Sequence, residues 1–381
     1  MENVVVPVVQ RIERRFPKAK TAFLPGSARI YQSKNRYDSS LPQLPLHDSP
    51  SKTAHVVSRR ITPNTQRRRE IIIMIFPPST VLILGAGAST PYGFPLGIEL
   101  KRTITSNTST GNTNNITRAN REQLLDAGYT ESEIHEFHTA LERSNHLTID
   151  AFLEDRPSHR GLGAFAIAQA LMPLESEDKL FGGTDWYPKL FNALNLKAAD
   201  SPSHVSGIIT FNYDRSLEHY LAETTRWRFE GNIKEAAFAK LNRIPVIHVH
   251  GALGFYPDLP YEPHNSIDDI KSGASGIKII DDCDLDDAAE FKQARALIES
   301  ASVVIFLGFG YDQRSIRRLD IPKNDSAPAV FGTARLDPQR TQEVSALFAN
   351  RIKLDTQWCS VDAYLLRLQQ TNQGLESRTR A

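Results

Sequence analysis

Short apolar runs alternate with stretches of helical periodicity over most of this chain. The clearest run covers residues 81–84, where four apolar residues lead into a Gly-x-Gly turn formed by Gly85 and Gly87. A continuous apolar run this short is typical of a strand buried on both faces, as in a parallel sheet. Pro95 stands where a following helix would begin, and the apolar residues after it have helical spacing. The pattern predicts a strand, a glycine turn and a helix, a unit whose amide groups and helix dipole can hold an anion.

Helical periodicity dominates from about residue 107 to residue 200. Thr130 and Glu133 have the spacing of a capping box, and Ile134, Phe137 and Leu141 follow at helical intervals. This segment separates the first apolar run from the second. We therefore expect a helical insertion subdomain between the first two strands of the sheet.

Apolar runs of strand length return after residue 200. They occupy residues 207–211, 245–249, 302–307 and 329–332, with helical patterns at 215–222, 285–300, 342–348 and 360–369. Strands that alternate with helices predict an α/β fold with a doubly wound, Rossmann-like parallel sheet. Residues 256–276 are rich in Pro, Asn, Asp, Ser and Gly, and we expect them to form a mobile lid.

The first 73 residues differ from the rest in composition. Residues 1–70 carry 14 basic and 5 acidic residues, a net charge of +9, whereas the remaining 311 carry 31 basic and 39 acidic residues, a net charge of −8. A polar, basic segment without periodicity cannot bury enough apolar surface to offset its chain entropy. We expect a disordered basic extension over 1–73 and one domain over 74–381. Met74 lies just before the first strand, so a mis-assigned translation start is one hypothesis for part of the extension.

Composition narrows the class of protein further. The charge of the domain disfavours nucleic acid as a partner, except through the basic extension. The two cysteines of the 381-residue chain, Cys283 and Cys359, exclude a disulfide framework and suit a reducing compartment. Apolar runs are too short for a membrane helix, and the N-terminus does not resemble a signal peptide. These features predict a cytoplasmic protein without membrane contact.

Polar residues or a glycine turn follow four of the apolar runs, at the edge where a parallel sheet binds its ligands. They are Ser89, Asn212 with Asp214, His250, and the turn formed by Gly308, Phe309 and Gly310.

Each of these residues also has a structural alternative. Asn212 could be a turn residue, and Asp214 could cap the following helix. If the strand ends at Val249, His248 belongs to the core and His250 is free for chemistry. The aspartates at 281–287 fit a solvated loop and helix N-terminus better than a metal site.

The glycine turn departs from the fingerprint of dehydrogenases. The third glycine of G-x-G-x-x-G is replaced by Thr90, and no acidic residue stands about 20 positions further on to bind a ribose. A hydride-transfer enzyme is therefore disfavoured.

The four motifs, in this order, resemble the sirtuin-like NAD-binding domain, and are most similar to the bacterial sirtuin-like NAD hydrolases of anti-phage defence. The segments 149–153 and 186–187 also resemble that branch, and the likeness covers about residues 80–335. The resemblance implies that Asn212 lies by the nicotinamide ribose and that His250 is the catalytic base. It implies a set of NAD-binding residues: Gly85, Ala86, Gly87, Ala88, Ser89, Phe94, Phe211, Asn212, Asp214, Gly308, Phe309 and Gly310.

The chain lacks the two C-x-x-C pairs that hold zinc in protein-deacylating sirtuins, so no zinc or other metal is expected. The resemblance then implies an NAD hydrolase that uses NAD as substrate and depletes it during defence. A protein partner or activator and a homo-oligomer are expected. A non-catalytic NAD or ADP-ribose sensor, an ADP-ribosyltransferase and a deacylase remain the alternatives.

Overall fold

The structure, a computed structural model, describes residues 75–109, 114–183, 185–197, 203–254, 258–279, 288–322, 327–357 and 360–379, with side chains up to residue 370. All of these residues belong to one compact unit. The basic extension over 1–73, the aspartates at 281–287, Cys283 and Cys359 lie outside the described residues.

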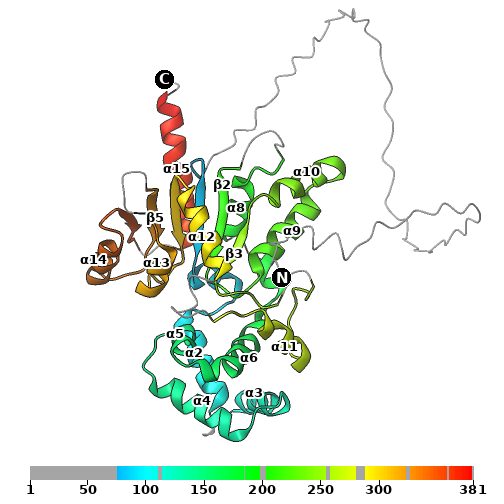
Figure 1. Ribbon diagram of the computed structural model, residues 1–381. Helices are drawn as coiled ribbons and strands as arrows, with labels where there is room; N and C mark the ends of the chain where they lie inside the picture. The colour runs from blue at the N-terminus through cyan, green and yellow to red at the C-terminus, as the bar shows by residue number, and fades with distance from the viewer. Residues whose placement is uncertain are drawn as a thin grey trace, which may run out of the picture. The chain divides into compact units, whose positions relative to one another are not determined.

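A six-stranded parallel sheet forms the centre of this unit, with the strand order β3-β2-β1-β4-β5-β6 (Figure 1). The strands are β1 (Thr80–Leu84), β2 (Val205–Thr210), β3 (Val246–His248), β4 (Val303–Leu307), β5 (Ala329–Thr333) and β6 (Ile352–Asp355). This order confirms the predicted Rossmann-like fold class. The sequence did not predict β6, which lies at the sheet edge and alternates apolar and polar residues over only four positions.

Helices cover both faces of the sheet. Leu82 and Leu84 of β1 belong to one buried cluster, and Val81 and Ile83 belong to a second. The first cluster includes residues of α8 (Trp186–Ala193), α9 (Ser216–Arg228), α10 (Gly231–Leu241) and α15 (Val361–Thr379). The second includes residues of α12 (Ala289–Glu299), α13 (Gln313–Leu319) and α14 (Pro338–Leu347). Burial of each such Val, Leu or Ile side chain stabilises the fold by about 1.5–3 kcal/mol, which explains the continuous apolar run of β1.

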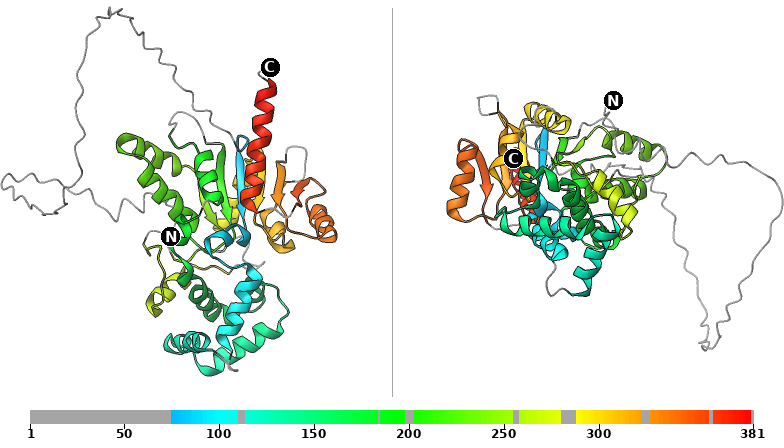
Figure 2. Two further views of the ribbon diagram at one scale, coloured as in Figure 1. Left: turned by 180° about the vertical axis from the view of Figure 1, so that it is seen from behind. Right: turned by 60° about the horizontal axis from the view of Figure 1, so that its bottom comes forward.

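The predicted helical insertion is present between β1 and β2. It begins with α2 (Gly97–Thr108), before the predicted boundary at residue 107, and continues through α3 (Asn115–Asp126), α4 (Glu131–Arg143), α5 (Ile149–Asp155), α6 (Arg160–Leu171) and α7 (Glu177–Phe181). Helix α8 falls within the predicted range of 107–200, but it packs against the sheet. Figures 1 and 2 show α2 to α6 gathered beyond one end of the sheet. The predicted capping box starts α4, where Thr130 accepts a hydrogen bond from the Glu133 amide and Glu133 accepts one from the Thr130 amide.

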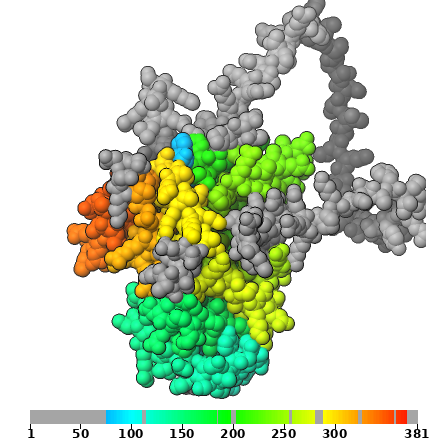
Figure 3. All heavy atoms as spheres, viewed as in Figure 1, coloured from blue at the N-terminus to red at the C-terminus, as the bar shows by residue number. Residues whose placement is uncertain are grey.

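The segment predicted as a mobile lid contains a packed helix where the structure describes it. Helix α11 (Ile267–Ser275) lies against α6, and a Cβ on Gly273 would approach Met172 Sδ to 2.3 Å. Hydrogen bonds from Gly254 N to Gly273 O (3.1 Å) and from Lys278 N to His250 O (2.8 Å) tie the segment to the loop after β3. The space-filling view in Figure 3 shows α11 continuous with the helical insertion. The small residues from which we predicted a mobile lid permit close packing of α11 against its neighbours.

A buried ion pair attaches the chain before α7 to the start of α9, and hydrogen bonds from the same arginine reach the chain before α11. Arg215 and Glu175 form two hydrogen bonds, and their side chains are 1% and 0% exposed. Arg215 also donates to the carbonyl oxygens of Leu259 (2.6 Å) and Pro260 (3.0 Å). Removing this guanidinium would therefore leave a carboxylate and two carbonyl groups buried without their donor.

We predict that Arg215→Met lowers the free energy of unfolding by about 3–5 kcal/mol, the usual cost of breaking a buried ion pair. The control is Lys278→Met, because Lys278 is 43% exposed and pairs only with Glu290 among the described residues. Its loss should cost no more than about 1 kcal/mol. Urea denaturation of both variants at neutral pH measures the difference, and equal losses of stability would contradict the role given to Arg215.

Candidate active site

Two glycine turns interlock at the carboxyl ends of β1 and β4. Gly85 N donates to Leu307 O (3.1 Å), and Gly87 N donates to Gly308 O (2.9 Å). Gly308 has a φ of +60°, and a Cβ on it would lie 2.1 Å from Ala88 N. Cβ atoms on Gly85 or Gly87 would lie 2.8 Å from Gly308 O. The glycines are therefore required for contact between the two turns, in addition to any approach of a ligand.

The turn after β1 offers fewer unpaired amide groups than the sequence suggested. The amides of Gly85, Gly87, Ala88 and Ser89 all donate to backbone carbonyls. Only Ala86, within the turn, has no acceptor for its amide among the described residues. Two 3-10 turns, η1 (Ala86–Ala88) and η2 (Thr90–Tyr92), follow β1, and α2 begins only at Gly97. The sequence predicted that several amides of this turn could bind an anion. Among the described residues of the turn itself, only the amide of Ala86 is unpaired.

Asn212 connects the end of β2 to this turn. Its Nδ2 donates to Gly85 O (3.0 Å) and to Ser89 Oγ (2.9 Å), and the residue is buried. A backbone carbonyl can only accept, so Nδ2 must face Gly85 and the orientation of the amide is fixed. Asn212 Oδ1 accepts no hydrogen bond from any described residue, and it is the part of the side chain that can accept one from a ligand.

Asp214 extends the polar network toward α9. Its Oδ1 accepts from the backbone amide (3.2 Å) and the hydroxyl of Ser216. Burial raises the pKa of Asp214 above its usual value, and hydrogen bonds from the Ser216 and Ser89 hydroxyls oppose that rise. Asp214 thus accepts from the first amide of α9, as the capping interpretation predicts, and it also contacts Ser89. A role of Asp214 toward a ligand stays a prediction.

The two histidines of the β3 segment have different surroundings. Strand β3 ends at His248, whose Nδ1 lies 2.8 Å from Asn212 O and whose Nε2 lies 2.5 Å from Glu218 Oε1. Burial lowers the pKa of His248, but the charge and hydrogen bond of Glu218, together with the Asn212 carbonyl, raise it above its usual value on balance. His248 is thus held between β2 and α9 and serves the structure.

His250 follows β3 in a turn and is enclosed by aromatic rings. Its ring centroid lies 5.5 Å from that of Phe211 and 5.9 Å from that of Phe291, both in edge-to-face geometry. The residue is only 6% exposed, and its imidazole makes no hydrogen bond to the residues that the structure describes. Burial lowers the pKa of His250 below its usual value, while Asp150 and Glu154 act in the opposite direction. A neutral imidazole without a protein partner is able to accept a proton.

A cavity of about 1070 Å³ lies along the glycine turns and the start of α2. It is lined by Ala86, Gly87, Phe94, Gly308, Phe309 and Gly310 among the predicted binding residues. Residues 333–336, at the end of β5, and Thr148 before α5 also line it, and neither was predicted from sequence. Its lining does not include the other predicted residues: Gly85, Ala88, Ser89, Phe211, Asn212, Asp214 and His250. The ring centroid of Phe211 lies 5.5 Å from that of His250 and 5.0 Å from that of Phe309.

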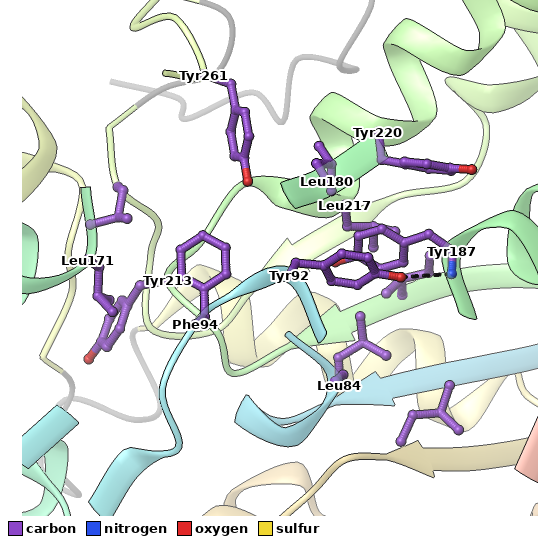
Figure 4. Packing of buried hydrophobic residues seen from close by; sticks show 14 of the residues in the cluster. Leu84, Tyr92, Phe94, Leu171, Leu180, Tyr187, Tyr213, Leu217, Tyr220 and Tyr261 are labelled. Atoms are coloured by element: carbon purple, nitrogen blue, oxygen red, sulfur yellow. Dashed lines mark hydrogen bonds between the residues drawn. The ribbon is translucent and has the colours of Figure 1, made fainter. Parts of the chain in front are cut away.

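Aromatic residues of α8 support the turn after β1. Trp186 Nε1 donates to Ala88 O (2.8 Å), and Tyr187 N donates to Tyr92 Oη (2.9 Å). The rings of Tyr92 and Tyr187 are stacked with centroids 3.9 Å apart (Figure 4). The Trp-Tyr pair was noted in the sequence without a role, and its partners could not be identified there.

Within the described ranges, no group of three or more His, Cys, Asp or Glu side chains could hold a metal ion. In the same ranges, no helix is long and apolar enough to cross a membrane. Comparison of the chain with protein-family models and with curated proteins gave no match.

The geometry of the second glycine turn predicts that alanine destabilises the protein at Gly308 but not at Gly310. Gly308→Ala forces a left-handed residue, at about 1–2 kcal/mol, and adds a backbone clash with Ala88. We expect a loss of at least about 2 kcal/mol in stability by urea denaturation. Gly310→Ala is the control, because nothing lies within 4 Å of its Cβ position. A Gly308 variant as stable as the Gly310 variant would show that the turns do not interlock.

The His248–Glu218 pair predicts a pH dependence of stability. A raised pKa in the folded state contributes stability that is present below pH 6.5 and is lost as the pH rises through the folded-state pKa. Glu218→Gln should therefore cost about 1.5–3 kcal/mol at pH 6 and clearly less at pH 9. Urea denaturation at both pH values tests this, and the same cost at pH 6 and pH 9 would rule out a charged His248.

Proposed function

We propose that this protein hydrolyses NAD at the bond between nicotinamide and ribose, giving nicotinamide and ADP-ribose. The observation that supports the proposal most is the fixed amide of Asn212. Its Nδ2 is held by Gly85 and Ser89, which leaves Oδ1 as an acceptor for a ribose hydroxyl or a water. The imidazole of His250 follows the neighbouring strand, β3, and lies against the ring of Phe211.

The chemistry of the bond explains why such a site suffices. Nicotinamide leaves as a neutral ring with the electron pair of the broken C–N bond, so it needs little acid catalysis. Positive charge develops on the ribose, as in glycoside hydrolysis. Water then forms the new C–O bond and gives up a proton. The protein must orient the ribose and the water, and it must accept that proton.

The described residues can be assigned to these tasks. Asn212 Oδ1 orients a ribose hydroxyl or the attacking water. His250, kept neutral by burial, accepts the proton from either group. Asp214 and Ser89 hold Asn212 and its turn in place. The sequence resemblance supports the same assignment of Asn212 and His250.

NAD is the substrate in this proposal, and the cavity along the glycine turns is where its ADP half would bind. Within this cavity Ala86 and Gly87 would lie at the diphosphate, and Gly308 to Gly310 with residues 333–336 at the adenosine. Phe94 and Phe309 supply apolar walls there. A setting in anti-phage defence by NAD depletion, with a protein activator and a cytoplasmic homo-oligomer, is part of the proposal and rests on the resemblance alone.

One observation favours a second candidate function, that of a sensor that binds NAD or ADP-ribose without cleaving it. The cavity reaches the glycine turns and the end of β5, whereas Asn212 and His250 do not line it. A ligand could therefore bind there without meeting the two groups that the reaction needs.

Chromatography of NAD incubated with the purified protein distinguishes these functions. We expect nicotinamide and ADP-ribose to form without any peptide. The assay should be run at several protein concentrations and with the product of the neighbouring gene, in case activity needs assembly or an activator. Nicotinamide release only with an acyl-lysine peptide would mean a deacylase, and transfer of ADP-ribose to protein a transferase. Tight binding of NAD without turnover under all these conditions would mean a sensor.

We predict that His250→Ala lowers the rate of NAD cleavage by about 10²–10⁴-fold, the usual contribution of a general base. Asn212→Ala should lower it by about 10²–10³-fold, and it should cost about 1–2 kcal/mol of stability because two buried hydrogen bonds are lost. The control is His135→Ala, since His135 is exposed on α4. Rates are compared with melting temperatures for all three variants. An active His250 variant would exclude this histidine as the base.

A further inference from the structure

We propose that helix α5 positions the active site, with Asp150 holding the turn that carries Asn212 and Glu154 holding the helix behind the second glycine turn. The effect of α5 on turnover rests on the proposed NAD hydrolysis, whereas the effect of α5 on the local structure does not. Asp150 and Glu154 are thus positioning residues, which act through Tyr213 and Arg318.

The first contact runs through Tyr213, which lies between Asn212 and Asp214 in the sequence. Tyr213 is buried, and its hydroxyl donates to Asp150 Oδ1 in the first turn of α5. Figure 4 shows Tyr213 beside Leu171, away from Tyr92 and Tyr187. The two residues that flank Tyr213 have other partners: Asn212 bonds to the turn after β1, and Asp214 to the start of α9. The turn after β2 is therefore held both by the turn after β1 and by α5.

The second contact runs through Glu154, one helical turn after Asp150. Its carboxylate accepts two hydrogen bonds from Arg318, at 2.7 and 3.2 Å, and one from Arg314. The side chains of Glu154 and Arg318 are 6% and 3% exposed. Bidentate pairs of this kind fix orientation as well as distance. Both arginines belong to α13, which begins three residues after Gly310.

The spacing of the two acids explains how one short helix makes both contacts. Positions i and i+4 lie on the same face of a helix, so Asp150 reaches Tyr213 and Glu154 reaches α13 from one face of α5. The start of α5 is fixed by Thr148, which accepts from the Ala151 amide (3.3 Å) and also lines the cavity. Helix α5 thus links the helical insertion to both sides of the proposed NAD site. The two carboxylates also act on His250, whose pKa they raise against the effect of burial.

Loss of the first contact should impair the chemistry more than binding. The cavity for the ADP half lies along the glycine turns and does not include Tyr213, so affinity should change little. Asn212 would lose its fixed position, and a displacement of 1 Å can cost about 100-fold in rate.

A double-mutant cycle with Tyr213→Phe and Asp150→Ala tests the proposal. Tyr213→Phe removes a single oxygen, so it should fold even if Asp150→Ala does not. We expect each variant to lower kcat by about 10- to 100-fold with KM for NAD nearly unchanged, and the double variant to be no worse than the singles. Tyr129→Phe is the control, because Tyr129 packs against Phe165 in the insertion, away from the strand ends. It should leave kcat unchanged.

Hydrogen exchange of the unliganded protein gives a readout that does not need activity. Exchange at residues 211–216 should rise in Tyr213→Phe and Asp150→Ala, and exchange at 311–319 should rise in Glu154→Gln. Additive effects in the cycle, or unchanged exchange in these segments, would overturn the proposal. If the wild-type protein does not cleave NAD at all, the proposed function fails, and the exchange data still decide whether α5 holds the two segments.

Discussion

The contact between the two glycine turns is the constraint on which the candidate site depends. Backbone meets backbone where Gly87 donates to Gly308, and there is no space for a Cβ on Gly85, Gly87 or Gly308. Strands β1 and β4 are neighbours in the sheet, so this contact continues their pairing one step beyond the strand ends. It fixes the carbonyl of Gly85 and the hydroxyl of Ser89, the two groups that orient the Asn212 amide.

Around this contact, the site is assembled from parts with different origins. The sheet supplies Asn212 and His250 from adjacent strands, β2 and β3. The helical insertion supplies α5, which bonds both to the turn after β2 and to α13 after β4. Aromatic residues of α8 also contact the turn after β1, where Trp186 donates a hydrogen bond to the carbonyl of Ala88. Contacts with residues far away in the sequence therefore hold Asn212 and His250 in place. Strands β2 and β3 determine only where the turns that carry these two residues begin.

The sequence predicts those features that depend on local patterns. Strands β1, β2 and β4 were recognisable because both of their faces are buried, and the Thr130–Glu133 capping box because its residues are three apart. Strand β6 was missed because an edge strand of four residues leaves no continuous apolar run. The Asp150–Tyr213 and Glu154–Arg318 pairs were missed because their partners are 63 and 164 positions apart. The number of unpaired amides at the first turn was overestimated, since only the structure shows which carbonyls accept them.

A crystal structure of the His250→Ala variant with NAD would test the central claim most directly, because this variant should bind the substrate without consuming it. We predict that the diphosphate lies over residues 85–89, the adenosine beside residues 308–310 and 333–336, and a ribose hydroxyl within hydrogen-bond distance of Asn212 Oδ1. An NAD molecule bound with its nicotinamide ribose away from Asn212 would contradict the assignment of this site to cleavage of NAD.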